Sequence, residues 1–188
     1  MAKIRLITLI VVLVLVAAGF FFTRSGDDGD LAGAELAGEV SLTHPGEQKT
    51  VDPDMSPPDF FITGKDEKVT SLAELKGKPV LINFWTTRCP PCVDEMPDLD
   101  KLYREYGNEV EFILINITAQ EKSVADVTTF LADNNYVLPV YLDRQAEVAR
   151  AYGIRGTPTT VVVGAGGEVV YAAAGRISYE QAKSLITK

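Results

Sequence analysis

A strand of the buried type, followed closely by a pair of cysteines, is the feature that most restricts the fold of this chain. Residues 80–85 are a nearly continuous apolar run of strand length, which is typical of a central strand covered on both faces. Cys89-Pro90-Pro91-Cys92 follows after a short gap. Proline is accepted at a first helical position, because the N–H that it lacks would be unpaired there anyway. The pattern therefore predicts a strand, a short loop and a helix whose first turn holds both sulfurs.

Around this unit, apolar residues recur with strand and helix periods that alternate along the chain. The expected elements are a short hairpin or edge element near residues 60–69, a brief helix at 71–75, strands at 80–85, 110–117, 140–142, 159–163 and 169–173, and helices at 90–106, 124–133, 146–152 and 179–188. A glycine-rich turn at 164–167 joins the last two strands, which should therefore be antiparallel. The order predicts an α/β fold with a central mixed sheet and helices on both faces.

The amino-terminal end has the features of a membrane anchor. Lys3 and Arg5 lie in the short segment 1–5, and residues 6–22 are almost wholly apolar. As a helix, these seventeen residues span roughly 25 Å, which is at the short end for a hydrocarbon core. A cleaved signal peptide is the alternative, but the small residues 17–19 are followed by three phenylalanines instead of a usual cleavage site. We expect an uncleaved transmembrane anchor, with residues 1–5 in the cytoplasm and the rest of the chain exported.

Between this anchor and the folded part lies a segment without a sustained apolar period. Residues 23–57 are rich in Gly, Asp, Glu, Ala and Pro, which predicts a flexible linker, and His44 within it is expected to be solvated. Residues 58–188 are then the predicted domain. The net charge of −8 argues against nucleic acid as a partner, because phosphates require a basic surface.

The spacing of Cys89 and Cys92 at the start of a helix suits thiol–disulfide exchange. Residues three apart in a first helical turn lie on one face, close enough to form a disulfide. The positive end of the helix dipole stabilises a thiolate, which is the attacking species, and Arg88 adds to this effect. We expect Cys89 to be the nucleophile and Cys92 to resolve the mixed disulfide.

Three less reactive roles for the pair compete with this interpretation. One of them, a pair of unreactive core thiols, is disfavoured in an oxidising compartment where the two cysteines are held adjacent. A zinc site requires about four ligands, and the chain has two cysteines and one histidine, which is far from them in the sequence. A purely structural disulfide is allowed by the geometry, but closing so small a loop brings little chain-entropy benefit. Redox chemistry is favoured, and no metal or other cofactor is expected.

The segments around the cysteines resemble those of a known family. Residues 83–92, followed by Glu95-Met96-Pro97, are similar to the active-site segment of TlpA/ResA-type thioredoxin-like proteins. Pro58-Asp59-Phe60 resembles the start of the same domains, and residues 153–160 resemble their cis-proline segment. The resemblance covers about residues 57–188 and implies a thioredoxin-like fold.

The resemblance also implies roles for single residues. Pro158 is the expected cis-proline facing the cysteines, and Thr157 is expected to offer backbone groups to a bound peptide. Glu95 stands where relatives place an acid that tunes the thiol pKa or relays a proton to Cys92. A first-turn glutamate that points into water is the equally weighted alternative. Trp85 is expected chiefly to pack below the motif, with substrate contact as a secondary role.

Two positions depart from the family pattern. Many relatives carry Trp immediately before the first cysteine, where this chain has Arg88, so the peptide-facing surface and the partners can differ. Ordinary thioredoxins have a buried Asp where this chain has Asn83, so an internal proton relay must use Glu95 or water.

These features predict a membrane-anchored thiol–disulfide oxidoreductase that acts outside the cytoplasm. The resemblance implies a reductant of exported proteins bearing disulfides, often apocytochrome c during haem attachment, with electrons from a membrane donor protein. A net oxidant would run the same chemistry in reverse. The alternatives are a thiol peroxidase of the redoxin type, which should have a lone peroxidatic Cys in its own loop, and a copper chaperone. Copper binding would require more His and Met ligands than Met96 alone provides.

Overall fold

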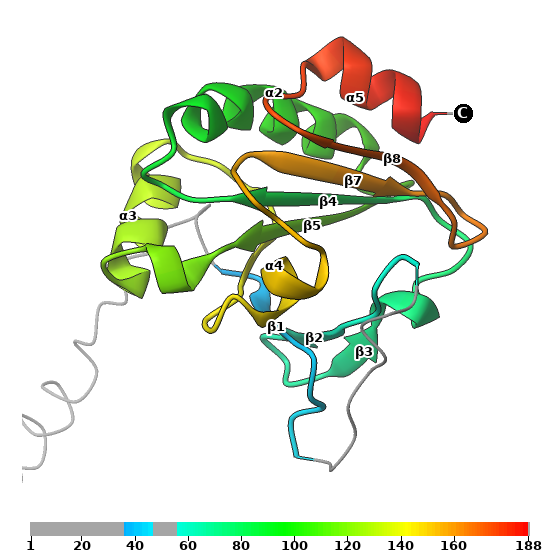
Figure 1. The fold of residues 1–188 in the computed structure, drawn as a ribbon. Coiled ribbons are helices and arrows are strands. Elements are labelled where there is room, and N and C mark those ends of the chain that lie inside the picture. Colours follow the sequence, from blue (N-terminus) through cyan, green and yellow to red (C-terminus); the bar gives the residue numbers. More distant parts are fainter. Residues whose placement is uncertain (1–35, 47–55, 188) are drawn as a thin grey trace, which may run out of the picture. The chain divides into compact units, whose positions relative to one another are not determined.

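The computed structural model describes residues 36–46 and 56–187, and this part of the chain folds around an eight-stranded mixed sheet (Figure 1). The strand order is β3-β2-β1-β6-β5-β4-β7-β8. Strands β4, β5 and β6 are parallel, whereas β7 and β8 are each antiparallel to the strand before them in this order. The strands are β1 (Gly38–Ser41), β2 (Phe61–Gly64), β3 (Val69–Ser71), β4 (Val80–Trp85), β5 (Glu111–Asn116), β6 (Val140–Leu142), β7 (Thr159–Val163) and β8 (Val169–Ala174). The helices are α2 (Pro90–Tyr106), α3 (Val124–Asp133), α4 (Glu147–Ala151) and α5 (Tyr179–Ile186), with 3-10 turns at Leu72–Glu74 and Thr118–Gln120.

Strand β4 lies inside the sheet, between β5 and β7, and all of its residues are buried. Side chains alternate between the two faces of a strand. Leu81, Asn83 and Trp85 therefore face α2, α3 and α5, and the intervening residues face α4 and the β2–β3 hairpin. Figure 1 shows α2 and α5 on one side of the strands and α4 on the other. The predicted mixed sheet with helices on both faces is confirmed.

The elements expected from residue 60 onward are present, with small differences in length. The brief helix after β3 is a single 3-10 turn, and the last helix ends at Ile186 instead of at 188. Helix α2 ends at Tyr106, as predicted, and Gly107 caps it. None of the helices in residues 36–46 and 56–187 combines the length and the apolar character needed to cross a membrane. The predicted span at 6–22 lies outside the described residues.

The linker prediction is wrong for part of its range. Residues 38–41 lie within the predicted linker but form β1, which pairs parallel with β6 and antiparallel with β2. This strand joins the β2–β3 hairpin to the rest of the sheet. His44, expected to be solvated, is half-buried, and its ring packs edge-to-face on Phe61 with 5.0 Å between the centroids. The folded domain therefore includes residues that precede 58.

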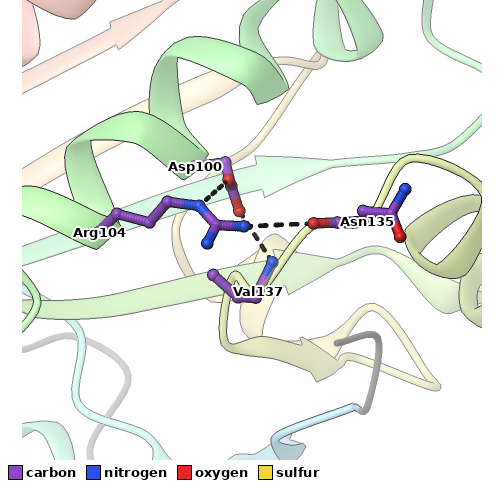
Figure 2. Close-up of polar contacts among 4 residues, drawn as sticks. All are labelled: Asp100, Arg104, Asn135 and Val137. Carbon is purple, nitrogen blue, oxygen red and sulfur yellow. Dashed lines mark hydrogen bonds and ion pairs between the residues drawn. The ribbon is translucent and has the colours of Figure 1, made fainter. Parts of the chain in front are cut away.

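A buried aspartate ties α2 to the loop between α3 and β6 (Figure 2). Asp100 Oδ1 accepts a hydrogen bond from the backbone N–H of Val137 at 2.8 Å, and Oδ2 accepts one from Nε of Arg104 at 2.7 Å. Arg104 also donates to the carbonyl oxygen of Asn135 at 3.3 Å. One carboxylate thus satisfies a backbone donor 37 residues away and holds the helix that carries both cysteines.

We expect Asp100→Asn to lower the free energy of unfolding by about 1 kcal/mol. The amide oxygen can still accept from Val137, but Arg104 loses its charged acceptor. Urea denaturation measures the difference. Asp94→Asn, at an exposed position on the same helix, is the control and should change stability by less than about 0.5 kcal/mol. Equal losses in the two variants would contradict the role given to Asp100.

Candidate active site

The loop after β4 delivers the two cysteines to the start of α2. Cys89 is the N-cap residue of α2, and Cys92 lies in its first turn, after Pro90 and Pro91. The two sulfurs are joined in a disulfide, with the Cα atoms 5.2 Å apart, which is within the usual range for such a bond. The predicted strand, loop and helix are confirmed.

The two cysteines differ in their access to solvent. Cys92 is fully buried, whereas Cys89 is half-buried and flanked by the exposed side chains of Arg88, Pro90 and Pro91. Of the two sulfurs, that of Cys89 is therefore the one that a partner can reach. Its Sγ accepts a hydrogen bond from the backbone N–H of Cys92 at 3.3 Å. When the disulfide is open, this donor at the helix N-terminus favours a thiolate on Cys89.

Glu95 lies one turn after Cys92, on the same face of α2. Its side chain is fully buried, so the alternative of a glutamate pointing into water is wrong. Oε1 accepts from Nδ2 of Asn83 at 2.8 Å, and Oε2 accepts from the backbone N–H of Ile177 at 3.0 Å. Burial raises the pKa of Glu95 from its ordinary 4.5 to about 6, against the opposing effect of the two hydrogen bonds and of Arg176. A carboxyl with such a pKa can both take and give a proton near neutral pH.

Asn83 connects Glu95 to the next strand of the sheet. Its Nδ2 also donates to Oγ1 of Thr160 at 3.1 Å, and both side chains are fully buried. Asn83 stands out in the sequence because ordinary thioredoxins have an Asp at this position. Nothing in the sequence indicates that Thr160 or the N–H of Ile177 belongs to the site. Both come from segments that are close to Glu95 only in the folded chain.

The start of β7 lies beside the end of β4, because Thr159 pairs with Phe84. Thr157 and Pro158 are therefore at the sheet edge from which the cysteine loop leaves. The bond between them is cis, as the family resemblance implies. Pro158 is buried and its carbonyl oxygen accepts from the N–H of Gly175 at 2.8 Å, whereas Thr157 is half-buried. Peptide binding by Thr157 and Pro158 stays a prediction.

Trp85 lies entirely inside the domain, with no exposed surface, and its ring packs on Phe130 with 5.6 Å between the centroids. The packing role is confirmed. The secondary role, contact with a bound substrate, is not available to a side chain in this position. Arg88 is exposed beside Cys89, where a partner can meet it.

A glutamate that the sequence did not indicate holds the loop before the cysteines. Glu121, which follows the 3-10 turn after β5, accepts from the backbone N–H and from the hydroxyl of Thr87, both at 2.6 Å. Nδ2 of the buried Asn116 also donates to Glu121, at 2.8 Å. Two loops at the same edge of the sheet are thereby joined two residues before Cys89.

Metal capture was an alternative role for the cysteines. Across residues 36–46 and 56–187, no group of three or more His, Cys, Asp and Glu side chains is arranged to hold a metal ion. The two sulfurs are bonded to each other. The arrangement is suited to disulfide exchange. The closed pair can react with a thiol that reaches Cys89, and the reduced pair can react with a disulfide that does so.

Comparison with known proteins gives the same result. The family model described as Redoxin matches residues 50–185. Thiol-disulfide oxidoreductase ResA of Halalkalibacterium halodurans is 37% identical over 131 residues, which are 69% of this chain and 68% of that protein. Thioredoxin-like protein YneN of Bacillus subtilis is 35% identical over 106 residues, or 56% of this chain and 62% of that protein. The crystal structure of StoA from Bacillus subtilis matches with a TM-score of 0.61 and 27% identity, covering 69% of this chain and 96% of that one.

The Redoxin match covers the part of the chain that carries the cysteine pair, the buried acid and the cis-proline. The resemblance to TlpA/ResA-type proteins is confirmed, and the α/β fold is thioredoxin-like. The chain belongs to the redoxin family, and it is a thiol–disulfide oxidoreductase whose redox-active pair is Cys89 and Cys92.

Proposed function

We propose that this protein reduces disulfides in exported proteins at the outer face of the cytoplasmic membrane, with residues 6–22 as its anchor. The observation that carries the proposal is the order along α2 of a reachable Cys89, a buried Cys92 and a buried Glu95. The anchor is supported by the apolar run at 6–22 and by the cations in residues 1–5 that precede it.

The reaction follows from the positions of the two sulfurs. In the reduced protein the Cys89 thiolate attacks one sulfur of a substrate disulfide, which breaks that bond and forms a mixed disulfide. Cys92 then gives its proton to the Glu95 carboxylate and attacks Sγ of Cys89. The substrate leaves with both sulfurs reduced, and its two thiolates take protons from water. The substrate gains two electrons, and the Cys89–Cys92 disulfide forms. A membrane donor protein with a dithiol of its own restores the reduced pair.

The buried acid supports the reducing direction. A cysteine pair whose thiolate form is strongly stabilised becomes an oxidant, as in DsbA. Here Glu95, with a pKa of about 6, is charged at neutral pH and disfavours a second negative charge on Cys92 one turn away. Cys92 therefore stays a thiol in the reduced pair, and the reduced form gains stability from a thiolate at Cys89 alone. A smaller gain of this kind favours passing electrons to a substrate.

Trapping of substrates in cells tests the proposal. Cys92→Ser leaves Cys89 able to form a mixed disulfide but removes the sulfur that resolves it, so exported proteins should accumulate on Cys89, apocytochrome c among them. Non-reducing gels and mass spectrometry identify what is bound. Cys89→Ser is the matched control. Recovery no higher than in this control would contradict exchange with proteins, and recovery of cytoplasmic proteins alone would contradict the location.

A further inference from the structure

Asn83, Thr160 and Glu95 form a buried polar unit under the redox pair. The side-chain amide of Asn83 lies between the carboxylate of Glu95, at 2.8 Å, and the hydroxyl of Thr160, at 3.1 Å. None of the three side chains is exposed. Asn83 and Thr160 are direct partners in the antiparallel ladder of β4 and β7, which sets their side chains on the same face of the sheet.

The chemistry of this unit suits an acid that changes its protonation state. An ionised carboxylate only accepts hydrogen bonds, whereas a protonated one also has a hydrogen to donate. In the structure Nδ2 of Asn83 donates to both Glu95 and Thr160. A rotation of the amide by half a turn replaces Nδ2 with Oδ1, which can then accept from a protonated Glu95 and from the hydroxyl of Thr160. Oδ1 has no partner among the described residues, so the rotation gives up only the two bonds that Nδ2 makes, and Oδ1 replaces both of them.

We propose that Asn83 and Thr160 are positioning residues that keep Glu95 hydrogen-bonded both with and without a proton, so that it can accept the proton of Cys92 and return it in the next cycle. This inference rests on the proposed function, in which Cys92 gives its proton to Glu95 as it attacks Cys89. When the donor protein reduces the pair again, the same proton goes back to the Cys92 sulfur. An aspartate at position 83 would instead place a second acid beside Glu95.

Few other groups act on Glu95. On its own helix Asp98 disfavours the ionised form, and Cys92 lies one turn before Glu95. From the loop before α5 come the N–H of Ile177 and Arg176, which favour it. Arg176 and Asp98 form an ion pair at 3.4 Å. Because their charges are opposite, their effects on the pKa of Glu95 oppose each other. The neutral side chains of Asn83 and Thr160 can each donate or accept a hydrogen bond. They are therefore the part of the site that can stay hydrogen-bonded whether Glu95 is ionised or protonated.

The test measures the resolving step alone, in the full chain. Cys89 is loaded with 5-thio-2-nitrobenzoate, and the release of this reporter by Cys92 is followed against pH. In the wild type the rate should rise through a midpoint near the pKa of Glu95, about 6. Asn83→Leu removes the donor to ionised Glu95, so the midpoint should rise by about one unit. Release should then slow by about tenfold at pH 5, below both midpoints, and by about twofold at pH 7.

Two substitutions of Thr160 distinguish the effect of losing its hydroxyl from the effect of changing its packing. At pH 5, Thr160→Val should slow release severalfold, whereas Thr160→Ser keeps the hydroxyl and should stay within about twofold of the wild type. Thr128→Val, on α3 with its hydroxyl bonded to the carbonyl of Ala125, is the control for losing a threonine hydroxyl. The ¹³C shift of the Glu95 carboxyl, followed against pH in the disulfide form, reports the same midpoint without any turnover.

The outcomes distinguish this inference from the function on which it rests. A Glu95 midpoint that is unchanged in both Asn83→Leu and Thr160→Val would overturn the inference while leaving disulfide exchange intact. Equal rates in Thr160→Ser and Thr160→Val would also overturn it, because the hydroxyl would then have no role. Failure of the wild type to release the reporter would instead overturn the proposed function.

Discussion

Replacing Cys89 with serine should lower the steady-state rate of disulfide reduction by at least about a thousandfold. Cys89 is the sulfur that a substrate can reach, since Cys92 is fully buried. A serine hydroxyl is almost entirely protonated at neutral pH and cannot form the mixed disulfide. The measurement is the reduction of a fluorescent peptide disulfide with dithiothreitol as electron source, after subtraction of the uncatalysed rate.

Cys92→Ser should stop turnover as well, but at a different point in the cycle. Cys89 remains a nucleophile, so each molecule should take up one equivalent of substrate in a burst and then stall. Cys89→Ser should show no burst. Retention of turnover in Cys89→Ser, or a burst carried by Cys92 alone, would show that the order of attack assigned from burial is wrong.

The strands around the cysteines could be predicted because their signal is local. Residues 80–85 are apolar without a break, and the structure explains this by covering both faces of β4. Strand β1 has no such signal, because Val40 is its one buried residue. It forms a strand because it pairs with β2 and β6, which lie elsewhere in the sequence. Gly38 shows the same dependence, since a Cβ there would lie 1.8 Å from the carbonyl oxygen of Thr63.

In the active site, too, the features set by local spacing could be predicted, and those set by distant contacts could not. The cysteines, the helix start and the position of Glu95 on α2 follow from spacing within a few turns, so the sequence was sufficient to predict them. Whether Glu95 points to water or into the domain depends on Asn83 and on the N–H of Ile177, which is 82 residues away. Glu121, which holds Thr87 from 34 residues away, depends on the pairing of β4 with β5 in the same manner. Contacts of this kind are set by the topology and leave no periodic pattern in the chain.

The buried Glu95 should also make the stability of the disulfide form fall as the pH rises. Its pKa is about 6 in the folded protein and ordinarily 4.5, so between these values the folded state holds more protons than the unfolded chain. The stability that this group contributes is therefore complete below pH 4.5 and is lost as the pH rises through 6. The shift corresponds to about 2 kcal/mol of unfolding free energy.

Urea denaturation of the wild type and of Glu95→Gln between pH 4 and 7.5 measures this effect. Burial also raises the pKa of Glu111 and of Asp143, so the wild-type curve alone does not isolate Glu95. Glutamine keeps the acceptor for Asn83 and does not titrate, so the difference between the two proteins does isolate it. This difference should change by about 2 kcal/mol across the window, in favour of the variant at high pH. The disulfide stays closed throughout, so neither cysteine contributes. Parallel curves would mean that Glu95 ionises in the folded protein as easily as in the unfolded chain, and such a group could not serve as the proton acceptor for Cys92 that the reducing cycle requires.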